Sequence, residues 1–172
     1  PNTRFMLTYQ VAENGSWTPS NLSALAAEKQ YFRTEPVTAA KAPTYTSGEL
    51  YVDQNLTLKG AWTFGGWKRS DTGATVEANG KFEMPGNDVT LTGQWSFTPD
   101  TYTVSYDIGN GTGTPPESHD SYDYSALPDK AGCVEASGIP LGASIKVRDF
   151  SGPAPEGSVF AGWSSVNPAP EE

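Results

Sequence analysis

The side chains that could do nucleophilic or acid–base chemistry are few in this sequence. It contains one histidine, His119, and one cysteine, Cys133. His119 lies between Ser118 and Asp120, but a catalytic triad needs three side chains that converge in space, and neighbours in a polar loop do not supply that. Cys133 has one basic residue nearby, Lys130, which offers little to activate a thiolate. We predict a solvated turn at His119 and a small buried residue at Cys133.

Carboxylates are the other groups that could form a site. The acidic, tyrosine-rich residues 120–124 could hold paired carboxylates of the kind that glycosidases use, and Asp107, Asp120 and Asp123 could form a loose calcium site. The EF-hand pattern does not occur, and one histidine with one cysteine cannot form a zinc cluster. We therefore predict a surface loop at residues 120–124, no metal site, no cofactor and no catalytic residue.

Residues 109–113 are glycine-rich, which raises the question of phosphate binding. They lack the lysine and the spacing of a P-loop, and Asn110-Gly111 is typical of a tight turn after a strand. We predict a turn there.

The charge of the chain argues against polyanionic partners. The net charge is −9 at pH 7, which disfavours nucleic acid and anionic membranes. Residues 1–97 carry 8 basic and 9 acidic side chains, whereas residues 98–172 carry 3 and 11. No run of about 18 apolar residues is present to span a membrane. We predict a monomer without membrane insertion, whose acidic second half is a solvated surface or, alternatively, a partner-binding face.

An internal repeat organises the elements that would position these residues. The motif Phe64-Gly65-Gly66-Trp67 returns 96 residues later as Phe160-Ala161-Gly162-Trp163, and the alternating residues 5–11 return as 102–108. Several matches at nearly one displacement predict two copies of one module, residues 1–98 and residues 99–172. The chain begins with Pro1, and we expect a piece of a longer protein.

Apolar alternation and turn residues predict that each copy is mostly β. In the first copy, strands are expected at residues 5–11, 49–53, 56–67 and 89–95. A helix is expected at residues 21–32, where Asn21 or Ser23 can cap the helix and alanines favour it. In the second copy, strands are expected at residues 102–108, 144–148 and 158–163.

The second copy is short by about one strand. At this displacement Glu172 corresponds to Val76, so residues 77–95 have no counterpart. We expect the second module to lack its closing strand and to expose an unpaired edge, and such edges recruit other strands. The link at residues 98–101 is short and contains a proline, which favours modules in an end-to-end row.

The order of these motifs resembles the Listeria–Bacteroides repeat, which is related to the B repeats of internalin-type surface proteins. The residues that carry the resemblance are 5–11, the Phe-x-Gly-Trp motif, 80–85 and 88–95. It implies a small β-grasp-like module found in tandem in secreted or wall-anchored bacterial proteins. It brings no catalytic residues with it.

Together these observations predict an α+β, mostly β fold of two β-grasp-like modules arranged end to end. The expected function is that of a non-catalytic repeat region of a bacterial cell-surface or secreted protein, acting as an adhesin stalk, spacer or interaction module. The alternatives are a domain that binds a carbohydrate or a host protein and an accessory domain of a glycan hydrolase. Trp67 and Trp163 are expected to fill the cores of their modules. The structural motif comprises Phe64, Gly65, Gly66, Trp67, Trp95, Phe160, Gly162 and Trp163.

Overall fold

The computed structural model describes residues 2–128, 130 and 132–165. Within this part the chain forms β-strands, a short 3-10 helix at Tyr124–Ala126 and no α-helix. The prediction of a mostly β fold is confirmed, while the β-grasp arrangement stays a prediction. None of the described helical segments has the length and apolar character needed to cross a membrane.

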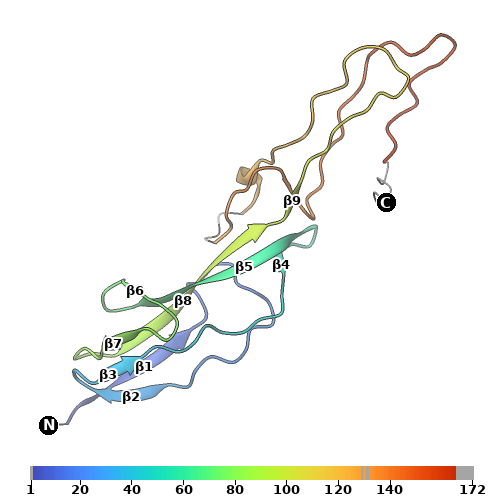
Figure 1. Ribbon diagram of the computed structural model, residues 1–172. Helices are drawn as coiled ribbons and strands as arrows, with labels where there is room; N and C mark the ends of the chain where they lie inside the picture. The colour runs from blue at the N-terminus through green and yellow to red at the C-terminus, as the bar shows by residue number, and fades with distance from the viewer. Residues whose placement is uncertain (1, 129, 131, 166–172) are drawn as a thin grey trace, which may run out of the picture.

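The strands gather in the first half of the chain, and Figure 1 shows long extended loops in the second half. The strands are β1 Arg4–Gln10, β2 Lys29–Phe32, β3 Pro36–Thr38, β4 Glu49–Asp53, β5 Leu56–Arg69, β6 Thr75–Val76, β7 Lys81–Glu83, β8 Val89–Pro99, β9 Thr101–Tyr102 and β10 Ile139–Pro140.

The main sheet has the strand order β2-β1-β8-β5-β4, and β6 pairs with β5. The long strands β5 and β8 run antiparallel, from Gly60 opposite Pro99 to Arg69 opposite Leu91. β1 and β8 run parallel, with Leu7 opposite Val89. β8 is therefore the central strand, and it holds the first strand of the sheet to the longest one.

The helix predicted at residues 21–32 is wrong. Residues 22–28 form no regular element, and Lys29–Phe32 is strand β2, antiparallel to β1. Asn21 has a φ of 59°, which is not the extended backbone of a helix cap. Tyr31 is buried in the core of the module. Tertiary packing of β2 outweighs the modest helix propensity of the alanines.

Two hydrophobic clusters lie along the sheet. The Trp62 cluster has the buried residues Trp17, Leu50, Val52, Leu58, Trp62, Trp95, Phe97, Ile139 and Ala143. The Trp67 cluster has Leu7, Tyr31, Val37, Ala39, Trp67, Met84, Val89 and Leu91. Phe64 packs against both clusters and joins them.

A β-bulge in β5 brings both clusters to one face of the sheet. Strand side chains alternate between faces, so Phe64 and Trp67, three residues apart, would otherwise point to opposite sides. The register shifts between Phe64 and Gly66, and one extra residue restores a common face. Gly66 has a φ of 108°, which a side-chain-bearing residue rarely adopts.

The strands predicted in the second copy are mostly absent from the described residues. Of residues 102–108, Tyr102 belongs to β9 and Val104 forms an isolated bridge with His119. Residues 144–148 and 158–163 form no strand. In the first copy the corresponding strands β1 and β5 both pair with β8. No described residue of the second copy takes the place of β8. The counterparts of β1 and β5 therefore have no strand between them to pair with among the described residues.

Residues 139–143 of the second copy pack onto the end of the first sheet. Ile139 and Ala143 are buried in the Trp62 cluster. The Lys59 amide donates to the Leu141 carbonyl at 2.8 Å, and the Asp100 amide donates to the Lys59 carbonyl at 2.9 Å. Residues 139–143 thus contribute to the core of the first copy. The division near Pro99 stays a prediction.

Candidate functional site

His119 is held by its backbone. Its amide donates to the Val104 carbonyl at 2.8 Å, and the Val104 amide donates back at 3.0 Å. The imidazole lies beside the Tyr106 ring, with centroids 5.9 Å apart. Its Nε2 atom is buried and has no hydrogen-bond partner in the described part of the chain. The structure therefore uses His119 as a bridge residue packed on an aromatic ring.

The carboxylates singled out in the sequence serve local turns. Asp107 accepts from the Gly109 amide at 2.7 Å. Asp123 accepts from the Ser125 hydroxyl and from the Ser125 amide, and these bonds lower the pKa of the Asp123 carboxyl. Among the described residues, no group of three or more His, Cys, Asp and Glu side chains is placed to hold a metal ion.

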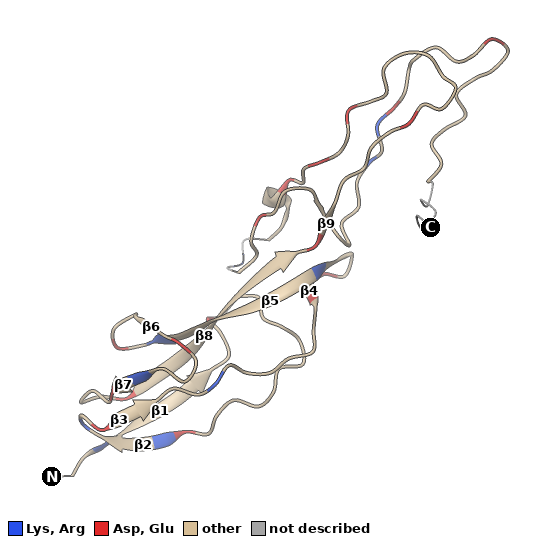
Figure 2. Ribbon diagram, in the orientation of Figure 1, with Lys and Arg blue, Asp and Glu red and all other residues tan. Residues whose placement is uncertain are grey.

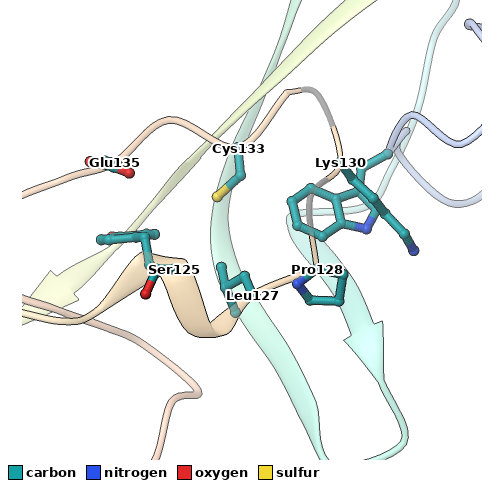
Figure 3. Close-up of a pocket in the computed structure, with 8 residues that line it drawn as sticks. Ser125, Leu127, Pro128, Lys130, Cys133 and Glu135 are labelled. Atoms are coloured by element: carbon teal, nitrogen blue, oxygen red, sulfur yellow. The ribbon is translucent and has the colours of Figure 1, made fainter.

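A cavity of about 310 Å³ lies beside the Trp62 cluster (Figure 3). The residues that line it are Trp17, Tyr124, Ser125, Leu127, Pro128, Lys130, Cys133 and Glu135. The Lys130 ammonium lies 5.5 Å from the centre of the Trp17 ring, a cation–π contact.

Burial disfavours the ionised forms of the thiol and the phenol that line this cavity. Burial raises the pKa of the Cys133 thiol, and the nearby Glu135 carboxylate raises it further. Burial also raises the pKa of Tyr124, although the Ala136 amide opposes this shift. A protonated thiol is a poor nucleophile, and both shifts disfavour the ionised forms of these side chains.

In the first copy the Phe-Gly-Gly-Trp motif is part of an aromatic clamp, in which Tyr9, Phe64 and Trp67 surround the backbone of Ala40. The Trp67 ring lies edge-on to both Phe64 and Tyr9, with centroids 5.0 Å apart in each case. The Trp67 Nε1 atom donates to the Ala40 carbonyl at 2.8 Å, and the Ala40 amide donates to the Tyr9 hydroxyl at 2.9 Å. A tyrosine and a tryptophan thus hold both backbone groups of one residue.

The same clamp occurs in the second copy. Phe160 and Trp163 lie 5.1 Å apart at 69°, against 5.0 Å and 70° for Phe64 and Trp67. The Trp163 Nε1 atom donates to the Arg148 carbonyl at 2.7 Å, and the Arg148 amide donates to the Tyr106 hydroxyl at 2.8 Å. Gly162 repeats the left-handed backbone of Gly66, with a φ of 135°. Two segments with the same motif therefore build the same local structure.

The two clamps differ in burial. Trp67 is 1% exposed, whereas Trp163 is half-buried and Phe160 is 42% exposed. In the first copy Trp95 covers Phe64, with ring centroids 4.9 Å apart, and its Nε1 atom donates to the Val11 carbonyl at 3.0 Å. The first clamp is a core element and the second lies at a surface.

Sequence reasoning found the aromatic members of each clamp but not the residue that they hold. Ala40 and Arg148 contribute only backbone groups, so their side-chain types carry no signal. They are also 108 positions apart, while the aromatic residues are 96 or 97 apart. The cavity beside the Trp62 cluster was missed because its lining residues are scattered along the chain and have no motif spacing.

Comparison with protein families gives a different family from the one that the motifs suggested. A model of the SHIRT domain matches residues 19–98, a little under half of the chain. The resemblance to the Listeria–Bacteroides repeat is therefore wrong. The motifs that carried this resemblance are not specific to one family. Alternation, a glycine bulge and a closing strand are features that any aromatic β-sheet module of this kind requires.

The SHIRT domain is a repeat-type domain of bacterial surface proteins. The region with this similarity takes in β2 to β7 and β8 as far as Thr98, and it contains Phe64 and Trp67 but not Tyr9. No curated protein and no solved structure matches the chain.

Proposed function

We propose that this segment is a non-catalytic, load-bearing spacer in a bacterial surface protein. The observation that carries the proposal is the parallel pairing of β1 with β8, Leu7 opposite Val89 through Gln10 opposite Thr92. The first strand of the sheet is thus bonded directly to the strand that leads out of it. The similarity of residues 19–98 to a surface-protein domain supports the setting.

This arrangement determines how the first copy responds to tension. Force enters β1 at its amino end and leaves β8 at its carboxyl end, in opposite directions along two parallel neighbours. The hydrogen bonds between them are then loaded together in shear, rather than opened one after another. A spacer under flow needs this resistance, because its first loaded contact decides its mechanical strength.

The line of force continues into the second copy. β8 ends at Pro99 and β9 begins at Thr101, and Figure 1 shows the second half extending away from the sheet in the direction of β8. The Asp100 and Leu141 backbones bond each other and Lys59 across this junction. The extended outline fits a spacer better than a module with a catalytic cleft.

We propose that the segment lies outside the bacterial cell and acts as a monomer. Figure 2 shows acidic residues along the extended second half with few basic ones beside them, which favours a solvated, self-repelling surface. A host protein or a glycan remains the alternative ligand for this face.

Single-molecule force spectroscopy tests the proposal. In a Cys133→Ser background, handles at Asn2→Cys and Asp100→Cys load β1 and β8 in shear. Handles at Asn2→Cys and Asn87→Cys pull the same strands apart from one end, and they serve as the matched control. We expect a several-fold higher unfolding force in the shear geometry. Equal forces in the two geometries would overturn the load-bearing role.

A further inference from the structure

Three asparagines of this chain are followed directly by glycine, in the dipeptides Asn14-Gly15, Asn79-Gly80 and Asn110-Gly111. All three asparagines are exposed and lie in tight turns. An asparagine in this context can react with its own backbone, because the glycine has no side chain to hinder access to the amide nitrogen. In a folded protein the reaction depends on whether that nitrogen is accessible or already donates a hydrogen bond.

Two of the three glycine amides close the turns in which they lie. The Gly80 amide donates to the Glu77 carbonyl at 2.8 Å. The Gly111 amide donates in the same way to the Ile108 carbonyl at 2.9 Å. In each case the glycine is the fourth residue of a β-turn, whose amide bonds the carbonyl of the first residue. Each nitrogen must therefore break a hydrogen bond before it can attack the asparagine side chain.

Asn14-Gly15 occupies a different place in its turn. Here the Ser16 amide donates to the Glu13 carbonyl at 3.1 Å, so the dipeptide provides the second and third residues. Gly15 has a φ of 81°, the left-handed value that the third residue of a type II turn requires. Its amide has no acceptor among the residues that the structure describes. A Cβ atom at Gly15 would meet nothing within 4 Å, so the nitrogen is both unbonded and uncrowded at this one of the three sites.

We propose that Asn14 is a site of spontaneous, age-dependent modification, at which the side-chain amide is converted to a carboxylate. The Gly15 amide gives up its proton to hydroxide, and its nitrogen attacks the Asn14 Cγ atom. The new carbon–nitrogen bond closes a five-membered succinimide ring while the Cγ–Nδ2 bond breaks, and the side-chain nitrogen leaves as ammonia with a proton from water. Water then opens the ring at one of its two carbonyls, which gives aspartate or isoaspartate at position 14.

The position of Asn14 determines what the modification changes. Its turn joins β1 to Trp17, a buried member of the Trp62 cluster. The adjacent Glu13 carboxylate pairs with the Lys68 ammonium of β5 at 2.5 Å. A new carboxylate adds a second negative charge beside this ion pair, and the isoaspartate product lengthens the main chain by one atom before Trp17. The modification therefore alters both charge and chain length where β1 connects to the core.

Ageing the full chain at mildly alkaline pH tests the proposal, with the other two sites as internal controls. The three asparagines fall in separate tryptic peptides, residues 5–29, 70–81 and 82–130, so mass spectrometry follows each one independently. In the folded protein we expect Asn14 to lose its amide at least about fivefold faster than Asn79 and Asn110. In guanidinium chloride the three rates should agree within about twofold, because the turns are lost. Equal rates in the folded protein, or an equally fast Asn14 relative to the others in denaturant, would overturn the proposal.

Matched variants test the chemistry. Isoaspartate in the aged, folded protein is labelled by an isoaspartyl methyltransferase. Asn14→Gln should abolish most of this labelling, because attack on the longer side chain would have to close a six-membered ring. Asn79→Gln is the matched control and should leave the labelling unchanged. Labelling of Asn14→Gln as strong as that of Asn79→Gln contradicts the proposal. These readouts are independent of mechanical strength, so this inference and the load-bearing role can fail separately.

Discussion

The Tyr9 hydroxyl and the Trp67 indole hold the two backbone groups of one residue, Ala40. The Ala40 amide donates to Tyr9 Oη at 2.9 Å, and Trp67 Nε1 donates to the Ala40 carbonyl at 2.8 Å. Because β3 ends two residues earlier, at Thr38, this contact fastens the β3 segment over the main sheet. The module thus closes its core with side chains that satisfy the backbone groups of a half-buried residue.

Tyr9→Phe tests this contact with the smallest change. The ring keeps its packing on Trp67, but the Ala40 amide loses its acceptor, so we expect a loss of about 1 kcal/mol of unfolding free energy. Tyr51→Phe is the control, because Tyr51 is 65% exposed. Thermal unfolding monitored by circular dichroism gives both values. A Tyr9→Phe protein as stable as the Tyr51→Phe protein would show that the hydrogen bond is dispensable.

The ionisation of Tyr9 adds a pH signature to the same experiment. Burial raises the pKa of Tyr9, although the Ala40 hydrogen bond opposes the shift. A raised folded-state pKa gives stability that is complete below the ordinary value of 10.0 and is lost as pH rises through the folded-state value. The wild type should therefore lose more stability than Tyr9→Phe above about pH 10.

Gly66→Ala should be the more damaging of two glycine substitutions at positive φ. A Cβ atom at Gly66 would lie 2.8 Å from both Thr75 Cγ2 and the Val76 carbonyl oxygen, while the space around Gly73 is open. Both residues have left-handed φ values, 108° and 71°. We expect about 2–4 kcal/mol for Gly66→Ala and about 1 kcal/mol for Gly73→Ala. Urea denaturation compares them, and equal losses would exclude a packing role for the bulge.

The sequence was sufficient to place the strands β1, β4, β5 and β8 of the first copy. It did not place the shorter strands β2, β3, β6 and β7, and it was insufficient for the second copy. Alternation at residues 5–11 and 89–95 reflects burial on one face, which is why β1 and β8 could be predicted. The same pattern at residues 102–108 forms little strand, because pairing needs a neighbour and alternation alone does not supply one. The alanines of residues 21–32 failed as a helix signal because β2 is held by Tyr31 in the core.

The candidate site was also predictable only in part from the sequence. Aromatic residues and glycines repeat in the sequence, so both clamps could be anticipated in part. Ala40 and Arg148 act through backbone atoms, and any residue type could serve. The bulge at Gly66 could have been inferred from the odd spacing of Phe64 and Trp67 on a strand with one buried face.

Asp71→Asn should make the free energy of unfolding fall less steeply as the pH is lowered. Arg69 donates to the Asp71 carboxylate through Nε at 2.9 Å and Nη2 at 2.6 Å, and this hydrogen bonding lowers the pKa of Asp71. A lowered folded-state pKa gives stability that is present above the ordinary value of 3.8 and lost as pH falls through the folded-state value. At neutral pH the free energies of unfolding of the wild type and of Asp71→Asn should differ by under about 1 kcal/mol.

The matched control for Asp71 is Glu28→Gln, since Glu28 is exposed on the irregular segment before β2. Unfolding by urea between about pH 2 and pH 6 should show a shallower slope for Asp71→Asn than for Glu28→Gln or the wild type. Parallel profiles for all three proteins would mean that the ion pair persists in the unfolded chain or adds nothing.

Gly142→Ala should detach the second copy from the first. Gly142 has a φ of 106°, and a Cβ atom there would meet the Thr57 carbonyl of β5 at close range. Gly157→Ala is the control, with a φ of 79° and open space around it. We expect hydrogen exchange at Ile139 and Leu141 to accelerate in Gly142→Ala alone, while Leu7 and Leu91 stay protected. Unchanged exchange at Ile139 would exclude this contact as the anchor.

Trp67→Phe and Trp163→Phe compare the two clamps directly. Trp67 is buried, so its replacement leaves a void and an unpaired Ala40 carbonyl, and we expect a loss of about 2–4 kcal/mol. Trp163 is half-buried, and water can replace its bond to the Arg148 carbonyl, so the loss should be under about 1 kcal/mol. Hydrogen exchange of β1 and β8 should respond to the first substitution and not to the second. A shared response would mean that the clamps belong to one cooperative unit, whereas separate responses would mean that each clamp stabilises its own copy.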